Sequence, residues 1–155
     1  MRTIQIMNRF RRLFRCDSGQ SLVETAFAVS LCAILMLGTA EFGRLAYAGI
    51  EISDSARAGV EYGSQSLPDA KDFGNMTTAA SLSAPNIKNL TLTASLFCRC
   101  VDGTSSSCTT TACGGARHIS YVQVNTSGSI NPLIYVPGLP KTYSLTGTAV
   151  MRVVD

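Results

Sequence analysis

Residues 19–40 read GQSLVETAFAVSLCAILMLGTA, and this stretch decides the architecture of the chain. Between Leu22 and Ala40 the only charged residue is Glu24. At a rise of about 1.5 Å per residue, a helix over residues 22–40 measures about 28 Å, which is close to the roughly 30 Å hydrocarbon core of a bilayer. The stretch therefore predicts a membrane-spanning helix. A carboxylate inside such a helix costs free energy, which makes Glu24 a candidate functional residue.

The sequence before this stretch is basic. The first 19 residues contain five arginines and one acidic residue, Asp17, for a net charge of +4. Residues 20–155 contain eight basic and nine acidic residues, which leaves the whole chain at +3. Because arginines beside a span stay in the cytoplasm, the N-terminus is predicted to be cytoplasmic and the rest extracytoplasmic. No basic stripe remains outside the leader, so no nucleic-acid partner is predicted.

A cleaved secretory signal is one alternative to a span. Such a signal has a shorter apolar core and a small-x-small cleavage motif, which residues 46–48 match. Two charged residues, Glu41 and Arg44, separate that motif from the apolar core, and the core itself is long. A soluble core helix would give no reason for the basic flank. Both alternatives are therefore less favoured than a span.

The helix is expected to continue beyond the span, over residues 20–66, with the transmembrane part at about 22–40. No proline occurs before Pro68, which provides a natural stop. Residues 41–66 become amphipathic, with an apolar face at Phe42, Leu45, Ile52, Ala56, Val60 and Gly63. The charged positions are expected to form a solvated face: Glu41, Arg44, Glu51, Asp54, Arg57 and Glu61.

Small residues are frequent along the whole helix. Each interior glycine, such as Gly38, Gly43 or Gly49, costs up to about 1 kcal/mol relative to alanine. Small residues also let helices approach closely in lipid. Their frequency favours helix–helix packing in the membrane.

The remaining residues, 67–155, predict a small extracytoplasmic α+β domain. A short helix is expected over residues 76–82, before Pro85. Alternation of apolar and polar residues then predicts strands at 90–96, 118–124 and 143–153, with residues 134–136 at most a short edge. Strands without long helices between them favour an antiparallel sheet, and the amphipathic half of the first helix is available to cover it.

Four of the six cysteines fall within 16 residues of each other, at Cys98, Cys100, Cys108 and Cys113. On the outer side of a membrane such a cluster favours disulfides. Cys98 and Cys100 share a strand face, so each is expected to bond to one of the downstream pair, in either of the two arrangements. The bonds would hold the loop 104–111. Zinc is a rival, but the C-x-C spacing is not the usual C-x2-C.

Motifs of catalysis are missing from the sequence. It contains no glycine-rich phosphate loop, no H-E-x-x-H and no G-x-S-x-G. The single histidine, His118, falls in a strand pattern. The prediction is a protein that is not an enzyme and that uses no metal or cofactor.

A basic leader ending in Gly19, an acid at the fifth position after it and an immediate apolar helix resemble a type IV prepilin. The segments 19–24, 37–44 and 56–59 more closely resemble the TadE-like pseudopilins of tight-adherence (Tad, or Flp) pili. The resemblance covers about residues 17–63. The major pilins of that system usually carry tyrosine after the acid and are much shorter, whereas this chain has Thr25.

The resemblance implies a minor pilin or pseudopilin that takes part in building or priming the pilus. It also implies cleavage of residues 1–19 by a prepilin peptidase, between Gly19 and Gln20. The implied fold is pilin-like, and the implied location is the bacterial inner membrane or the pilus. The implied partners are the peptidase, other pilin subunits, the inner-membrane assembly platform and the lipid bilayer.

Physical chemistry suggests a role for Glu24 after such a cleavage. The new α-amino group at Gln20 and the Glu24 carboxylate would lie at nearly the same depth in the membrane. Pairing between neighbouring subunits would relieve two desolvation penalties together and set their register. An unprocessed single-span protein with an external binding domain is the alternative function, and a redox or metal-binding domain is a weaker one.

Overall fold

The computed structural model describes residues 18–109, 113–114, 117–135 and 137–154. The leader up to residue 17, including Cys16, lies outside the described residues. The chain divides into two compact units, residues 1–42 and residues 43–155. The fold is α+β, with a long N-terminal helix and a small antiparallel sheet, as the sequence predicts.

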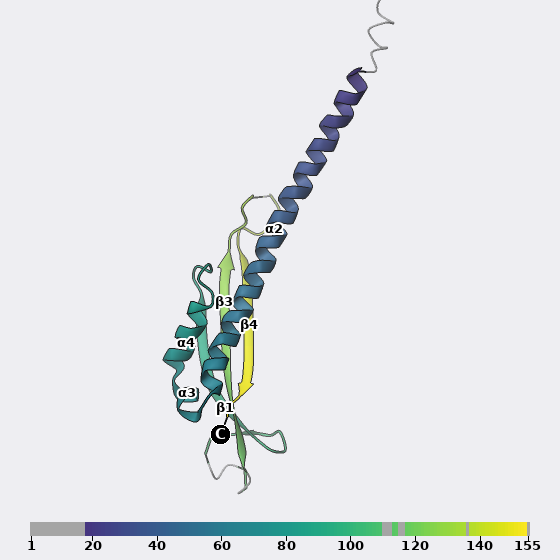
Figure 1. Ribbon diagram of the computed structural model, residues 1–155. Helices are drawn as coiled ribbons and strands as arrows, with labels where there is room; N and C mark the ends of the chain where they lie inside the picture. Colours follow the sequence, from purple (N-terminus) through teal and green to yellow (C-terminus); the bar gives the residue numbers. More distant parts are fainter. Residues whose placement is uncertain (1–17, 110–112, 115–116, 136, 155) are drawn as a thin grey trace, which may run out of the picture. The chain divides into compact units, whose positions relative to one another are not determined.

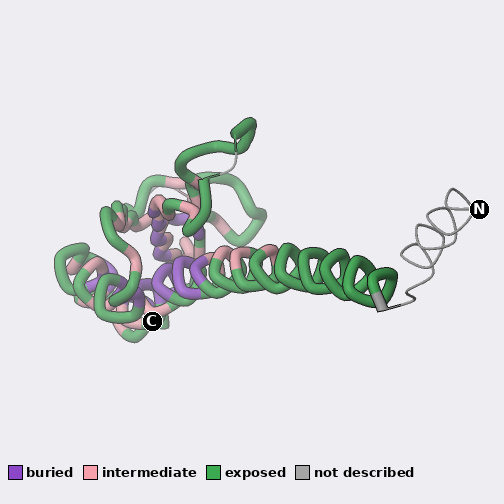
Figure 2. The backbone as a smooth tube through the Cα atoms, turned by 90° about the horizontal axis from the view of Figure 1, so that it is seen from above, coloured by how far each residue is buried: buried purple, intermediate pink, exposed green. Residues whose placement is uncertain are grey.

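The first helix, α2, runs without a break over Ser18–Ser64. Every described side chain from Gly19 to Leu37 is exposed, whereas most of the buried positions of α2 recur every three or four residues from Ala48 onward (Figure 2). The helix ends where its last turn is tied to the C-terminal segment, because the Ser64 carbonyl accepts a hydrogen bond of 2.9 Å from Val154 N. The end comes close to the expected stop at Pro68, but that proline lies in the next helix.

Two short helices follow and pack beside α2 (Figure 1). Helix α3 spans Leu67–Lys71, with Ser66 as its N-cap. Helix α4 spans Phe73–Leu82, and the Asp72 carboxylate caps it by accepting from Asn75 N at 3.0 Å. The sequence predicted only residues 76–82, because the apolar period begins at Met76. The cap, rather than the apolar pattern, sets the true start.

In the described residues the sheet has four strands, in the order β2-β1-β3-β4, and each neighbouring pair is antiparallel. The strands are β1 (Thr91–Cys100), β2 (Ser105–Ser106), β3 (His118–Ile130) and β4 (Tyr143–Arg152). Residues 134 and 135 belong to no strand, and Val136 lies outside the described residues. Prolines on both sides, which cannot donate to a ladder, explain why no edge forms there. The fourth strand is instead the short β2.

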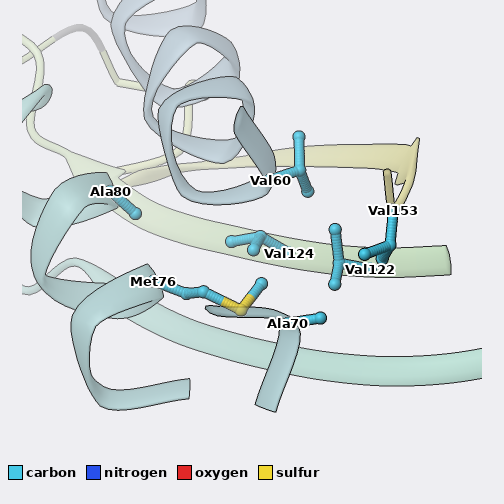
Figure 3. Close-up of a cluster of buried hydrophobic side chains, with 7 residues drawn as sticks. All are labelled: Val60, Ala70, Met76, Ala80, Val122, Val124 and Val153. Carbon is cyan, nitrogen blue, oxygen red and sulfur yellow. The ribbon is translucent and has the colours of Figure 1, made fainter. Parts of the chain in front are cut away.

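The core of the domain lies between the helices and one face of the sheet. One cluster of buried side chains comes from α2, α3, α4, β3 and the segment after β4, and Figure 3 shows its members: Val60, Ala70, Met76, Ala80, Val122, Val124 and Val153. The opposite face of the sheet carries mainly serine, threonine, asparagine and glutamine. The second half of α2 therefore covers the sheet, as its amphipathic pattern predicts.

The helix α2 and the sheet approach each other most closely around Ile52. Thr126 Oγ1 donates to the Ile52 carbonyl at 2.9 Å. A Cβ on Gly147 would lie 2.8 Å from the same carbonyl oxygen, and one on Gly128 would lie 2.6 Å from the Ile87 side chain. Strand β3 extends to Ile130, six residues beyond its expected end. Within that extension, Gly128 faces the Ile87 and Ile52 side chains, which leave no room for a Cβ.

Candidate functional site

The predicted processing site lies at the start of α2. Gly19 and Gln20 are both helical and exposed. A Cβ added to Gly19 would meet no atom within 4 Å among the described residues. Packing within this part of the chain therefore gives no reason for a glycine at position 19. Any reason for a glycine at this position must therefore come from a contact that the described residues do not make.

Glu24 lies one helical turn after Gln20, on the same side of α2, because residues four apart are neighbours on a helix. Its side chain is exposed, and no described residue provides its carboxylate with a hydrogen bond or an ion pair. The apolar side chains around it are exposed too, with Leu22 at 73% and Phe27 at 75%. The exposed carboxylate of Glu24 is accessible to a group on another molecule, as the hypothesis of an intermolecular partner requires.

The hydroxyl groups in the apolar half of α2 bond to the helix itself. Thr25 Oγ1 donates to the Ser21 carbonyl at 2.8 Å, and Ser30 Oγ donates to the Ala26 carbonyl at 2.8 Å. Thr39 Oγ1 lies 3.0 Å from two carbonyls of the preceding turn. No hydroxyl of these three residues then needs water, which suits a helix in hydrocarbon. By length and composition, α2 is able to span a membrane.

The glycines of α2 separate into two kinds. A Cβ on Gly38, Gly43 or Gly49 would meet nothing within 4 Å in the described chain. A Cβ on Gly59 would lie 3.0 Å from Val124, and one on Gly63 would lie 2.7 Å from Met76. The later glycines are therefore explained by the fold of the domain. The earlier ones are not, and they stay available for contacts with other helices.

The four clustered cysteines form two disulfides in the described residues, Cys98–Cys108 and Cys100–Cys113. The sequence left two arrangements open, Cys98–Cys113 with Cys100–Cys108 or the crossed alternative, and the structure has the crossed one. Cys98 lies in β1 and is only 1% exposed, so its bond to Cys108 ties the loop to the buried side of the sheet. As disulfides these sulfurs are not thiolate ligands for zinc. Cys32, in the apolar half of α2, is exposed and unbonded.

The sequence pattern predicts Glu51 on a solvated face of α2, and the structure shows that this prediction is wrong. Glu51 is only 8% exposed, and its Oε1 accepts bonds from Asn86 N at 2.9 Å and Asn86 Nδ2 at 3.1 Å. Its Oε2 is buried without a hydrogen-bond partner in the described chain. The carboxylate ties α2 to the segment between α4 and β1. Helical spacing placed Glu51 beside Asp54, and nothing in the sequence signalled that a distant loop would cover it.

A long helix that is apolar all round at first and amphipathic later, followed by a small antiparallel sheet, is a pilin-like α+β architecture whose helix is able to anchor the chain in a membrane. Residues 19–61 match the family model described as TadE-like protein. The match confirms the resemblance to TadE-like pilins of the Tad system and covers most of α2, but not the domain after it. Searches of curated proteins and of solved structures found no match.

The first helix is thus similar to that of TadE-like proteins, which are Tad pilus-associated pilins, and it is long and apolar enough to anchor the chain in a membrane. The sheet and the disulfides lie after residue 61 and are therefore outside the match. The Glu51 contact joins a residue inside the match to Asn86, which is outside it.

Proposed function

We propose that the chain is a minor pilin, or pseudopilin, that takes part in assembling or priming a Tad-type pilus for surface adherence. The observation that carries the proposal is the TadE-like match over a helix whose apolar half has no cover within the described chain. An uncovered apolar helix must be surrounded by lipid before assembly. In a fibre, neighbouring helices would take the place of that lipid.

The proposal includes cleavage between Gly19 and Gln20 by a prepilin peptidase. The open space around Gly19 supports this step, because the residue type is not needed for packing among the described residues. A peptidase needs close access to the backbone of the bond that it cuts, and glycine leaves that access free. The arginines of the leader support a cytoplasmic N-terminus. The two disulfides support an oxidising, extracytoplasmic location for the domain.

The test is the N-terminal sequence and intact mass of the protein extracted from membranes of cells that make the pilus. We expect the mature chain to begin at Gln20. Gly19→Val should abolish cleavage, whereas the matched control Gly38→Val should be cleaved normally, since both glycines are helical with open space around them. A chain that keeps Met1 in wild-type cells would overturn the proposal and favour an unprocessed membrane protein with an external binding domain.

The subunit-register role of Glu24 has its own test. After cleavage, the Gln20 amine of one subunit is proposed to pair with the Glu24 carboxylate of its neighbour, because each charge alone in lipid is costly. Glu24→Gln keeps the shape and removes the charge. We expect normal cleavage and membrane insertion but fewer fibres by electron microscopy. Normal fibres in normal numbers would contradict the pairing.

A further inference from the structure

The loop between β3 and β4 exposes an unusual amount of apolar surface. Four of its side chains project into the surroundings, and we call them the apolar loop surface: Leu133, Ile134, Tyr135 and Leu139. Leu133 is 67% and Leu139 is 54% exposed, although neither is charged or polar. Single exposed apolar residues are common, but a cluster on one loop marks an interaction site. The proposed function makes no use of this cluster.

The packing of α2 on β3 shows which end of the domain carries this loop. Ser64 of α2 lies near Val154, Gly59 lies against Val124, and Ile52 bonds to Thr126. Helix α2 and strand β3 therefore run in opposite directions, so earlier residues of α2 lie beside later residues of β3. At the far end, Ile130 lines a shallow groove together with Gly43, Arg44, Tyr47 and Ala48 of α2. The loop begins one residue later, at the end of the sheet where α2 enters the domain (Figure 1).

That end of the domain is the one next to the predicted span. Gly43 follows Ala40, where the apolar run ends, by three residues, or about 4.5 Å of helix. Chain connectivity alone therefore keeps Gly43 near the membrane boundary. The loop starts beside Gly43, so it lies within reach of the lipid headgroups.

The chemistry of the loop suits a lipid interface. Tyrosine is enriched where a membrane meets water, and the ring of Tyr135 lies 5.5 Å from the Lys141 ammonium group. Lysine near such a surface extends its charge toward the headgroups. Residues 131–142 contain this one lysine and no acidic residue, so nothing in the loop repels an anionic headgroup. Tyr47 of α2, which is also exposed, lies in the same groove as Ile130.

We propose that the apolar loop surface inserts into the outer interface of the same bilayer that α2 spans. The ligand is the phospholipid surface, with Leu133, Ile134 and Leu139 reaching the boundary between headgroups and acyl chains. Amphipathic elements of this kind penetrate about 5–10 Å. The loop is then a second contact with the membrane, which restricts how the domain is oriented toward the bilayer before assembly. The proposal rests on the span of α2 and goes beyond the assignment to a pilus.

The absence of tryptophan from the chain allows a direct test. Leu139→Trp places a single fluorescent reporter in the apolar loop surface of the full chain, reconstituted in phospholipid vesicles. Val101→Trp is the matched control, because Val101 is 71% exposed but follows β1 at the opposite end of the sheet. Tyr135→Trp is a second reporter, in which one aromatic side chain replaces another.

We expect both loop reporters to show blue-shifted emission in vesicles and to lose emission when the lipids carry bromine on their acyl chains. The Val101→Trp control should show neither change. Loop reporters that respond no more than the control would overturn the proposal. So would a blue shift that grows with protein concentration without bromine quenching, since that result assigns the surface to a second copy of the chain. The readout uses unassembled protein, so it is independent of cleavage at Gly19 and of fibre formation.

Discussion

The two halves of α2 form one continuous helix but have opposite environments. In residues 19–42 the large apolar side chains are exposed, whereas in residues 43–64 one face of the helix, which includes Ile52, Ala56 and Val60, is buried in the domain. Both halves contain isoleucine, glycine and glutamate. The same residue type therefore has a different physical role in each half, and the difference depends on which partner covers it.

Isoleucine should show the largest difference between the halves. Ile52 is completely buried, so Ile52→Ala is expected to lower the free energy of unfolding of the domain by about 2–5 kcal/mol. Ile34 is exposed within the span, so Ile34→Ala should leave that free energy unchanged. Urea unfolding of the full chain in detergent, followed by near-ultraviolet circular dichroism, measures both. Equal losses from the two variants would contradict the division of the helix.

Glycine should show an intermediate difference. Gly59→Ala introduces a methyl group 3.0 Å from Val124 and 3.1 Å from the Met76 carbonyl oxygen, which is expected to cost about 1–3 kcal/mol. Gly38→Ala meets nothing in the described chain and should not destabilise the domain. Gly38→Ala should instead reduce the number of fibres if that glycine serves contacts between subunits. Thermal unfolding tests the first expectation and fibre counts test the second.

Glutamate should show the smallest difference in stability. Glu51→Ala removes two hydrogen bonds to Asn86, but Asn86 is exposed and water replaces the lost acceptor, so the expected cost is about 1 kcal/mol. Glu24→Ala should leave the unfolding of the domain unchanged. A double-mutant cycle of Glu51→Ala with Asn86→Ala would isolate the side-chain contact. No coupling between the two would show that Glu51 does not hold the loop through the Asn86 side chain.

The fold class and most elements could be predicted from local patterns. The apolar run, the missing prolines and the alternating strands predicted the long helix, the α+β class and three of the four strands. These features could be predicted because each depends on residues close together in the sequence. The cysteine pairing could be narrowed to two arrangements, because strand alternation relates Cys98 and Cys100 but carries no information about a flexible loop.

Contacts between residues that are far apart in the sequence explain the features that could not be predicted. The second half of β3 is polar in sequence, and its residue types are explained only by distant neighbours: Thr126 donates to the Ile52 carbonyl, and Ile87 leaves no room for a Cβ at Gly128. Glu51 looked like one member of a charged face until the segment around Asn86 covered it. The proposed processing and pairing roles of Gly19 and Glu24 depend on other proteins, so no intrachain contact was expected to reveal them.

The sequence by itself determined that this chain has a membrane-length helix with one early acid and a disulfide-bearing α+β domain after it. Hydrophobic periodicity and covalent connectivity are local properties, so they can be read directly from the order of residues. The tertiary structure alone decided that Glu51 belongs to the buried side of α2, which cysteines are bonded to each other and which end of the sheet carries the apolar loop surface. Those features arise because residues distant in sequence compete for the same space, and only the folded chain resolves that competition.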